Sequence, residues 1–264
     1  MIVKETRIIA IANQKGGVGK TTTAISLGYG LANKGKKVLL VDLDPQSSLT
    51  VCMGIDDTDS IKNSISALIT KQINDVDVNN PEDYIMHHEN IDFIPCNIEL
   101  SAMEVSLVTA MSREYILTNI LGSYYGKYDY IIIDCNPSLG MLTINALTAA
   151  HEVIIPVTCE YLSAKGLELL LKSIVKVKKN LNPGLRIAGI VFTMYKSRTN
   201  LSKEIRNMIT DVYGSAIHIF KTKIPASVRM AEASMEACSI YSYSKNNQVA
   251  LAYTDLVSEV IEND

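Results

Sequence analysis

Two lysines in a glycine-rich stretch are the residues of this chain best suited to chemistry on phosphates. The stretch reads NQKGGVGKTT, Asn13 to Thr22, and from Gly19 onward it follows the phosphate-binding pattern G-x-x-x-x-G-K-[ST]. Where that pattern begins with glycine the chain has Gln14, and the next residue, Lys15, adds a second lysine. The stretch therefore predicts a phosphate site that holds one more cation than usual.

The remaining residues of the stretch fit the binding of a nucleotide. Its glycines let the backbone curl, so that N–H groups and the positive end of the following helix face the phosphates. We expect Lys20 to neutralise the β- and γ-phosphate oxygens and the Thr21 hydroxyl to bind Mg²⁺. The predicted nucleotide-binding residues are Lys15, Gly16, Gly17, Val18, Gly19, Lys20, Thr21 and Thr22.

Carboxylates follow two apolar stretches that are predicted to be buried strands. Asp42 and Asp44 end VLLVDLDPQ, and Asp134 ends YDYIIID. Any one of them alone could be a turn or helix-capping residue. In an open parallel sheet, however, the carboxyl ends of the strands form the ligand crevice, where the phosphate loop also lies. We therefore expect the loop and the acids to converge, with carboxylates available to hold a metal and to position water.

The elements that position these groups alternate between strand and helix patterns. Helical periodicity is found at residues 99–123, at residues 162–181 and in the last 19 residues. The alternation predicts a mostly parallel, twisted sheet with helices on both faces, as in a single-domain P-loop NTPase of the α/β class. The predicted buried strands are residues 6–13, 36–44, 91–95, 128–134, 152–157 and 186–194.

One domain spanning residues 1–264 is the simplest organisation, because we find neither an internal repeat nor a linker. Residues 53–90 are polar and acidic, and we interpret them as a surface excursion with one short helix at 60–70. The first strand begins near residue 6, so no N-terminal helix-turn-helix extension is expected.

Composition is that of an ordinary globular protein, with 47% hydrophobic and 20% charged residues. No apolar run reaches the roughly 18 residues of a membrane span, and no signal peptide is apparent, so a cytoplasmic location is expected. The five cysteines are scattered and form no C-x-x-C pair, which favours buried thiols. Residues 1–159 carry 11 Lys or Arg against 18 Asp or Glu, whereas residues 160–264 carry 14 against 10.

Three motifs in fixed order, KGGVGKTT, VDLDPQ and DCNPSLG, together resemble the ParA/MinD superfamily of deviant Walker A ATPases. The chain is most similar to the short, Soj-type ParA chromosome and plasmid partition ATPases. Later segments such as PVTCEYLSAKGLELLL and IPASVRMAEASMEACSIYSY extend the resemblance over nearly the whole chain. It implies slow ATP hydrolysis with ATP and Mg²⁺ as cofactors.

The resemblance also implies roles for individual residues. Lys15 matches the signature lysine, which reaches the nucleotide phosphates across a dimer interface, and Lys20 keeps its usual role. Asp44 matches the residue that orients the attacking water, and it could also contact Mg²⁺ through water. Asp134 matches the acid that supports Mg²⁺ through a water molecule. Pro225 falls where the family packs the adenine.

Two residues depart from the family pattern. Asn136 stands where the family has the first of two prolines, which puts the rigidity of that loop in doubt, and Ala226 replaces the usual arginine. Arg229 matches a basic residue of the family's DNA-binding face. Each neighbouring basic residue could be an ordinary exposed charge, but the candidates for the same role are Lys196, Arg198, Lys203, Arg206, Lys221 and Lys223.

A member of this family forms a homodimer in its ATP state and coats DNA without reading its sequence. A ParB-type centromere-binding partner accelerates hydrolysis and releases it. The resemblance thus implies a nucleoid-associated protein that moves a chromosome or a plasmid. Operator-specific repression is not expected without a helix-turn-helix extension.

Two other functions share the deviant loop. The first is a MinD-like membrane-cycling regulator, but the tail YTDLVSEVIEND is acidic, and anionic lipid would repel it, so no membrane partner is expected. The second is an iron–sulfur carrier resembling the nitrogenase iron protein. That function needs exposed cysteines, for which Cys135 with Cys96 or Cys159 are the candidates.

Overall fold

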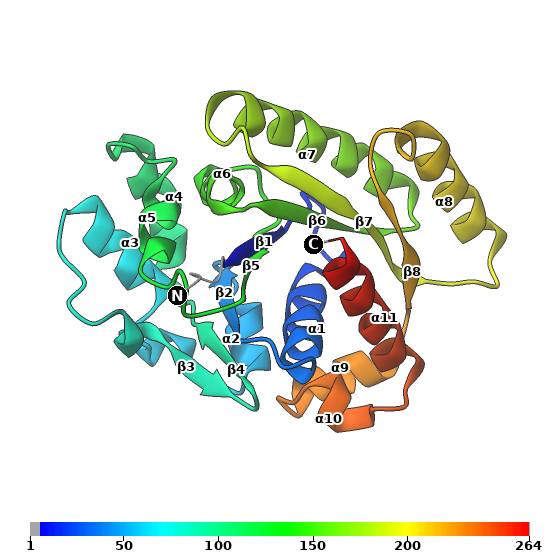
Figure 1. Ribbon diagram of the computed structural model, residues 1–264, viewed down its shortest axis with the longest axis horizontal. Coiled ribbons are helices and arrows are strands. Elements are labelled where there is room, and N and C mark those ends of the chain that lie inside the picture. The colour runs from blue at the N-terminus through cyan, green and yellow to red at the C-terminus, as the bar shows by residue number, and fades with distance from the viewer. Residues whose placement is uncertain (1–5, 264) are drawn as a thin grey trace.

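One eight-stranded sheet carries the loop and the acids, as the computed structural model shows (Figure 1). The model describes residues 6–263, and for residues 161–165 it describes only the backbone. The strand order is β3-β4-β2-β5-β1-β6-β7-β8, and every neighbouring pair is parallel except β3 with β4. The strands are β1 (Arg7–Ile11), β2 (Val38–Leu43), β3 (Met86–His88), β4 (Ile91–Ile94), β5 (Tyr130–Cys135), β6 (Glu152–Thr158), β7 (Arg186–Tyr195) and β8 (Ile219–Pro225).

Helices cover both faces of this sheet (Figure 1). No helix among residues 6–263 combines the length and the apolar composition needed to cross a membrane. The helices are α1 (Lys20–Asn33), α2 (Ser48–Cys52), α3 (Ile65–Ile73), α4 (Leu100–Thr109), α5 (Ile116–Gly122), α6 (Met141–Ala149), α7 (Tyr161–Asn180), α8 (Asn200–Tyr213), α9 (Val228–Met235), α10 (Ile240–Ser244) and α11 (Gln248–Glu262), with short 3₁₀ turns at η1 (Thr58–Ser60) and η2 (Pro81–Tyr84).

Strand residues alternate between two hydrophobic clusters, one on each face. On β1, Ile8 and Ala10 join the cluster under α3 to α8, whereas Ile9 and Ile11 join the cluster under α1 and α9 to α11. Strands β2, β5 and β6 are buried along their whole length. The continuous apolar runs in the sequence follow from this, because a central parallel strand is covered on both sides.

The predicted α/β fold is confirmed, and the six predicted strands are all present. Two further strands, β3 and β8, lie at the two edges of the sheet. In β8 the exposed Lys221 stands beside the buried Phe220, so the strand lacks the apolar run by which the central strands were found. Strand β3 has only three residues, which is too short to show an alternation of hydrophobic and polar side chains.

Residues 99–123, where helical periodicity is predicted, are largely helical but do not form one continuous helix. The chain forms α4 and α5 instead, separated by a turn in which Ser112 has a φ of +49°. The Arg113 Nη1 donates to the carbonyl of Val108 at 2.6 Å, which satisfies one of the last acceptors of α4. Helical periodicity continues through the break, so the period alone could not reveal it.

Residues 53–90 are more than the predicted surface excursion. Helix α3 begins after Ser64, whose hydroxyl accepts from the N–H of Ala67, and it buries Ile65, Leu68 and Ile69 in the main core. The helix also starts later than the predicted residue 60. Most of the polar residues in 53–90 lie in the connections that flank α3.

Close packing of α1 against α11 fixes the helix that follows the phosphate loop. A Cβ atom on Gly30 would lie 2.5 Å from Cγ2 of Val257 and 2.6 Å from the hydroxyl oxygen of Tyr241. That hydroxyl is held in place because it donates to the carbonyl of Ser26 at 3.1 Å. Glycine at residue 30 therefore allows the two helices to touch.

Replacing this glycine tests the packing. Gly30→Ala should lower the free energy of unfolding by about 1–3 kcal/mol, because overpacking outweighs the better helix propensity of alanine. Gly122→Ala is the matched control, since a Cβ there meets nothing within 4 Å, and it should raise stability by up to about 0.5 kcal/mol. Urea unfolding measures both changes, and equal values for the two variants would contradict this packing.

Candidate active site

The stretch from Gln14 to Gly19 forms a tight loop between β1 and α1. Gly17 has a φ of +71° and Gly19 a φ of +81°, conformations that favour glycine. A Cβ on Gly16 or Gly17 would meet no protein atom within 4 Å, so space for a ligand remains over the loop. Helix α1 begins at Lys20 and points its free N–H groups toward this space.

Residues that lie outside the loop of Gln14 to Gly19 hold it from both sides. The Asn13 Nδ2 donates to the carbonyl of Pro156 at 2.7 Å, while its Oδ1 accepts from the N–H of Lys15 at 3.0 Å. The Thr193 hydroxyl donates to the carbonyl of Val18 at 2.7 Å. Sequence reasoning missed Asn13 and Thr193, because their partners are distant in the chain.

Lys20 is buried at the centre of the site, with only 7% of its surface exposed. Its Nζ donates to the carbonyl of Lys15 at 3.3 Å. Burial lowers the pKa of Lys20, while the charges of Asp134 and Asp44 partly offset this. The carboxylates that the sequence predicts to converge there thus act on this buried cation through their charges.

Asp134 lies on the central strand β5, between Ile11 of β1 and Asp42 of β2 in register. It is completely buried, and neither carboxylate oxygen has a hydrogen-bond partner among the described residues. Burial raises the pKa of Asp134 well above its usual range, and the neighbouring Asp42 raises it further. The Thr21 hydroxyl and the charge of Lys20 act in the opposite direction and offset part of this rise.

A buried carboxylate with unused oxygens beside a threonine hydroxyl fits Mg²⁺. This ion takes oxygen ligands, keeps several of its waters and binds through few carboxylates. A cation near Asp134 and Thr21 would also remove the penalty of the uncompensated charge. The two residues predicted to support the metal are therefore found together.

Asp42 and Asp44 stand in different surroundings. Both oxygens of Asp42 accept hydrogen bonds, from the N–H of Asp44 at 3.2 Å and from the N–H and hydroxyl of Thr50 at 2.9 and 2.7 Å. Burial raises the pKa of Asp42 to about 6, although these hydrogen bonds offset part of the rise. Asp44 is less enclosed and accepts from the N–H of Gln46 at 3.0 Å. Asp42 is thus occupied by the protein, which leaves Asp44 and Asp134 for the ligand.

Lys15 lies at the surface of the site and forms an ion pair with Glu160, the residue before α7. The Glu160 side chain is 66% exposed and that of Lys15 is 24% exposed. The hydrogen bond and charge of Lys15 hold the pKa of Glu160 below its usual value. Sequence reasoning did not find this partner, which lies 145 residues away.

Asn136 stabilises the loop that follows Asp134. Its Nδ2 donates to the hydroxyl of Ser138 at 3.0 Å, and its Oδ1 accepts from the hydroxyl of Thr143 at 2.8 Å. The Thr143 hydroxyl lies within 2.7 Å of the Ser138 carbonyl as well. These side-chain bonds hold the loop where the family would have a proline.

A cavity of about 500 Å³ adjoins the phosphate loop and contains the predicted Pro225 in its wall. The loop and α1 contribute Gly19 and Thr22, and the remaining walls come from β7, β8, α9 and α11. Its lining is mostly apolar, which suits a purine base more than a phosphate. The other lining residues are Thr193, Met194, Ile224, Ala226, Ser227, Val228, Met230, Ala231, Ser234 and Tyr253.

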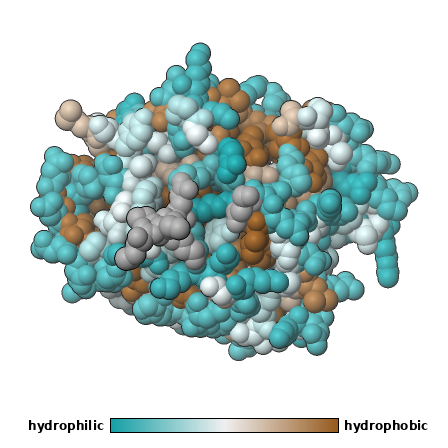
Figure 2. Space-filling model, in the orientation of Figure 1, coloured by the Kyte–Doolittle hydropathy of each residue, from teal (hydrophilic) through white to brown (hydrophobic). Residues whose placement is uncertain are grey.

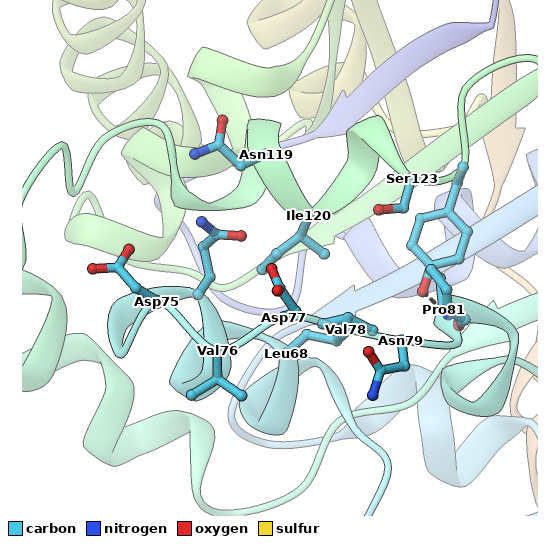
Figure 3. A pocket seen from close by; sticks show the side chains of 12 residues that line it. Leu68, Asp75, Val76, Asp77, Val78, Asn79, Pro81, Asn119, Ile120 and Ser123 are labelled. Atoms are coloured by element: carbon cyan, nitrogen blue, oxygen red, sulfur yellow. Dashed lines mark hydrogen bonds between the residues drawn. The ribbon is translucent and has the colours of Figure 1, made fainter.

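Another cavity, of about 540 Å³, lies between α3 and α5, away from the loop (Figure 3). Asp75 and Asp77 line it together with Leu68 and Ile120 (Figure 3). These carboxylates would repel a phosphate chain. The cavity at Pro225 is therefore the better candidate for the nucleotide.

The three cysteines considered as cluster ligands are all buried. Burial raises the pKa of the Cys96 and Cys135 thiols, and it raises the pKa of Cys159 to about 11. Such thiols are poor metal ligands, because binding requires the thiolate. These surroundings argue against the iron–sulfur function.

The candidate DNA-binding residues lie along one side of the molecule, from the end of β7 through α8 and β8 to α9 (Figure 1). Arg229 is exposed but forms an ion pair with Glu232 at 2.9 Å. Lys223 packs over the ring of Tyr195, with Nζ 5.9 Å from its centroid. Arg206 is half-buried, and the exposed members are Lys196, Arg198, Lys203 and Lys221.

A glycine-rich loop between a central strand and a helix, with carboxylates at neighbouring strand ends, defines a P-loop nucleoside triphosphatase. A family model described as an AAA domain matches residues 6–187. Sporulation initiation inhibitor protein Soj of Bacillus subtilis (strain 168) is 43% identical, and the match covers 97% of this chain and 99% of that protein. Chromosome-partitioning ATPase Soj of Treponema pallidum (strain Nichols) is 41% identical over 98% of both chains.

A solved structure has the same fold as this chain. Cobyrinic acid a,c-diamide synthase from Mycobacterium smegmatis, with bound ATP analog and magnesium, matches with a TM-score of 0.84 and 36% identity, over 97% of this chain and 95% of that one. The chain belongs to the Soj-type ParA family of ATPases. The family resemblance found in the sequence motifs is thereby confirmed.

Substituting the two buried acids separates their roles. In metal-free protein, Asp134→Asn should raise the free energy of unfolding by about 1–2 kcal/mol, because it removes a buried charge that lacks hydrogen-bond partners. Asp42→Asn should lower it by about 1–3 kcal/mol, since the new amide faces three donors. Thermal melts without and with ATP and Mg²⁺ measure both effects, and the ligand-dependent gain should vanish in Asp134→Asn.

The pH dependence has a defined sign. A pKa that is higher in the folded state than in the unfolded state means that stability falls as pH rises from the unfolded pKa toward the folded one. Asp134→Asn should flatten this fall. The measurement is the free energy of unfolding as a function of pH. If it fell with the same slope in wild type and in Asp134→Asn, the assignment of an unpaired, ionising Asp134 would be contradicted.

Proposed function

We propose that this partition ATPase binds ATP with Mg²⁺ at the loop, hydrolyses the γ-phosphate and uses the cycle to switch its hold on DNA. The observation that carries the catalytic part is the buried Asp134, which lacks partners and lies beside Thr21 and Lys20. A cation bound with a nucleotide would give the unpartnered Asp134 oxygens a positive charge to contact. Membership in the Soj-type ParA family supports the same activity.

The residues of the site divide the work of phosphoryl transfer. The loop N–H groups and Lys20 bind and orient the phosphate chain, and Thr21 and Asp134 hold Mg²⁺, which neutralises developing charge when bound. Asp44, whose environment is less enclosed than that of Asp42, orients the attacking water. Positioning and electrostatic stabilisation account for most of such a reaction, which agrees with a site built largely from backbone donors and fixed charges.

Lys15 is proposed to act on the nucleotide of a second subunit. Its side chain lies at the surface and is paired with Glu160, in contrast to Lys20, which is enclosed by its own chain. Reaching a partner's phosphates requires exchange of Glu160 for those phosphates. Exposed ion pairs of this kind are worth at most about 1 kcal/mol, so the exchange costs little. ATP thereby favours a homodimer that holds two nucleotides.

The proposed DNA surface is the basic stretch of residues 196–229, which carries seven Lys or Arg against two Asp or Glu. A surface of this kind binds phosphates without reading bases. Dimerisation doubles the number of phosphate contacts, which links ATP to DNA affinity. A ParB-type partner on a chromosome or plasmid would then accelerate hydrolysis and release the dimer.

Partition is favoured over diamide synthesis, the activity named for one solved neighbour. The two curated relatives named above are more similar to this chain than that neighbour is, at 43% and 41% against 36% identity. Residues 196–229 provide an excess of positive charge, which suits a polyanion.

Substitution of the two loop lysines tests the cross-subunit role. Lys20→Ala should abolish binding of a fluorescent ATP analogue, because it removes the buried cation. Lys15→Ala should retain binding but lose the ATP-dependent dimer in sizing chromatography, and hydrolysis with it. Lys172→Ala removes another surface lysine that pairs with a glutamate and serves as the control. A Lys15→Ala variant that dimerises and hydrolyses ATP normally would contradict the proposal.

DNA binding is tested by gel shift with plain plasmid DNA in the presence of ATP or ADP. We expect tight binding with ATP, weak binding with ADP and a steep loss with salt. Lys203→Ala and Arg198→Ala should each reduce the salt slope by about 1 without changing sequence preference, whereas Lys127→Ala, outside the basic stretch, should not. Equal binding in both nucleotide states, or none in either, would rule out the switch.

A further inference from the structure

Met194 differs from the other residues around the nucleotide cavity in its backbone conformation. Its φ is +48°, in the left-handed region that side chains other than those of glycine, asparagine and aspartate rarely adopt. The residue belongs to β7, whose regular conformation is extended. Conformations of this kind persist only where the surrounding structure imposes them, and they gather at functional sites.

A bulge in β7 accounts for the conformation. Phe192 pairs with Lys223 and Tyr195 pairs with Pro225, so three steps along β7 match two steps along β8. The extra residue in β7 breaks the regular alternation. Bulges next to binding sites commonly serve to redirect a side chain, and here the bulge redirects that of Met194.

The redirected side chain lies between the phosphate loop and the apolar wall of the cavity. Met194 lines the cavity that also contains Pro225. Its Cε lies 3.7 Å from the position that a Cβ on Gly19 would occupy, so the thioether reaches the glycine that immediately precedes α1. The preceding Thr193 holds the same loop through its hydrogen bond to the Val18 carbonyl.

Exposure alone would not single out this methionine. Met194 is 44% exposed, but Met208 on α8 is 38% exposed and Met235 on α9 is 87% exposed. Neither of these has a positive φ, and neither lines the cavity. What distinguishes Met194 is that a backbone cost places an exposed apolar side chain beside the site.

We infer that Met194 is a specificity-determining residue that packs its thioether against the base of the bound nucleotide, together with Pro225. The inference rests on the proposed function, because it takes this cavity as the place of the base. A thioether is flexible and polarizable and makes favourable contacts with aromatic rings. Met194 should thus strengthen the binding of ATP relative to that of the bare phosphate chain.

The test compares ATP with inorganic tripolyphosphate, each with Mg²⁺, by titration calorimetry on the full chain. Met194→Gly and Met194→Ala should weaken ATP binding by about threefold to tenfold and leave tripolyphosphate binding unchanged. Met194→Gly should also raise the thermal unfolding midpoint, because glycine adopts the positive φ without strain. A gain in stability with a loss of base-dependent affinity is not expected of a merely structural residue.

Met208→Ala is the matched control and should change neither affinity. Unchanged affinities for both ATP and tripolyphosphate in both Met194 variants would overturn the inference while leaving the proposed function intact. An equal loss for the two ligands would overturn it as well, since it would mean a distorted loop. A wild-type chain that binds neither ligand would refute the proposed function, and the inference with it.

Discussion

The uncompensated carboxylate of Asp134 is the constraint on which the rest of the site depends. A buried ionisable group without hydrogen bonds is costly, and this one lies in register with Asp42, a second buried acid. The cost is tolerated because Asp42 is fully hydrogen-bonded and because Lys20 lies nearby. A cation bound at this centre, as proposed above, would remove that cost, so that part of the folding free energy would be exchanged for affinity.

Several backbone positions around this centre have positive φ, and side-chain hydrogen bonds hold the loops beside them. Gly17 and Gly19 take positive φ where N–H groups must converge on phosphates, and Met194 does so beside them. Asn13, Thr193 and Asn136 hold the adjoining loops through side-chain hydrogen bonds. The loops that carry the chemistry are thus fixed before a ligand arrives, which lowers the ordering cost of binding.

How far the sequence predicts this molecule depends on whether the signal is local. The loop, Asp44 and Asp134 could be found because each lies in a short pattern, a glycine-rich turn or an acid after an apolar strand. Glu160 and Thr193 could not, because each meets its partner through the sheet topology, 145 and 175 residues away. Strand β8 was missed since an edge strand buries only part of its side chains. The sequence did not reveal the break between α4 and α5, because both helices lie within one range of predicted helical periodicity.

The contrast between the two loop lysines explains how one loop could serve two subunits. Lys20 is enclosed by its own chain and is bonded to the carbonyl of Lys15, which keeps its ammonium group away from the protein surface. Lys15 lies at the rim, paired with an exposed glutamate, while its N–H is fixed by Asn13. Figure 2 shows that the face viewed in Figure 1 is mostly hydrophilic, with hydrophobic side chains in scattered patches. The backbone of this loop is held by hydrogen bonds, and its outer cation, Lys15, can exchange Glu160 for another partner. Such a loop is able to signal nucleotide binding to a second subunit. In the proposed cycle, Lys20 keeps the nucleotide bound while Lys15 exchanges partners.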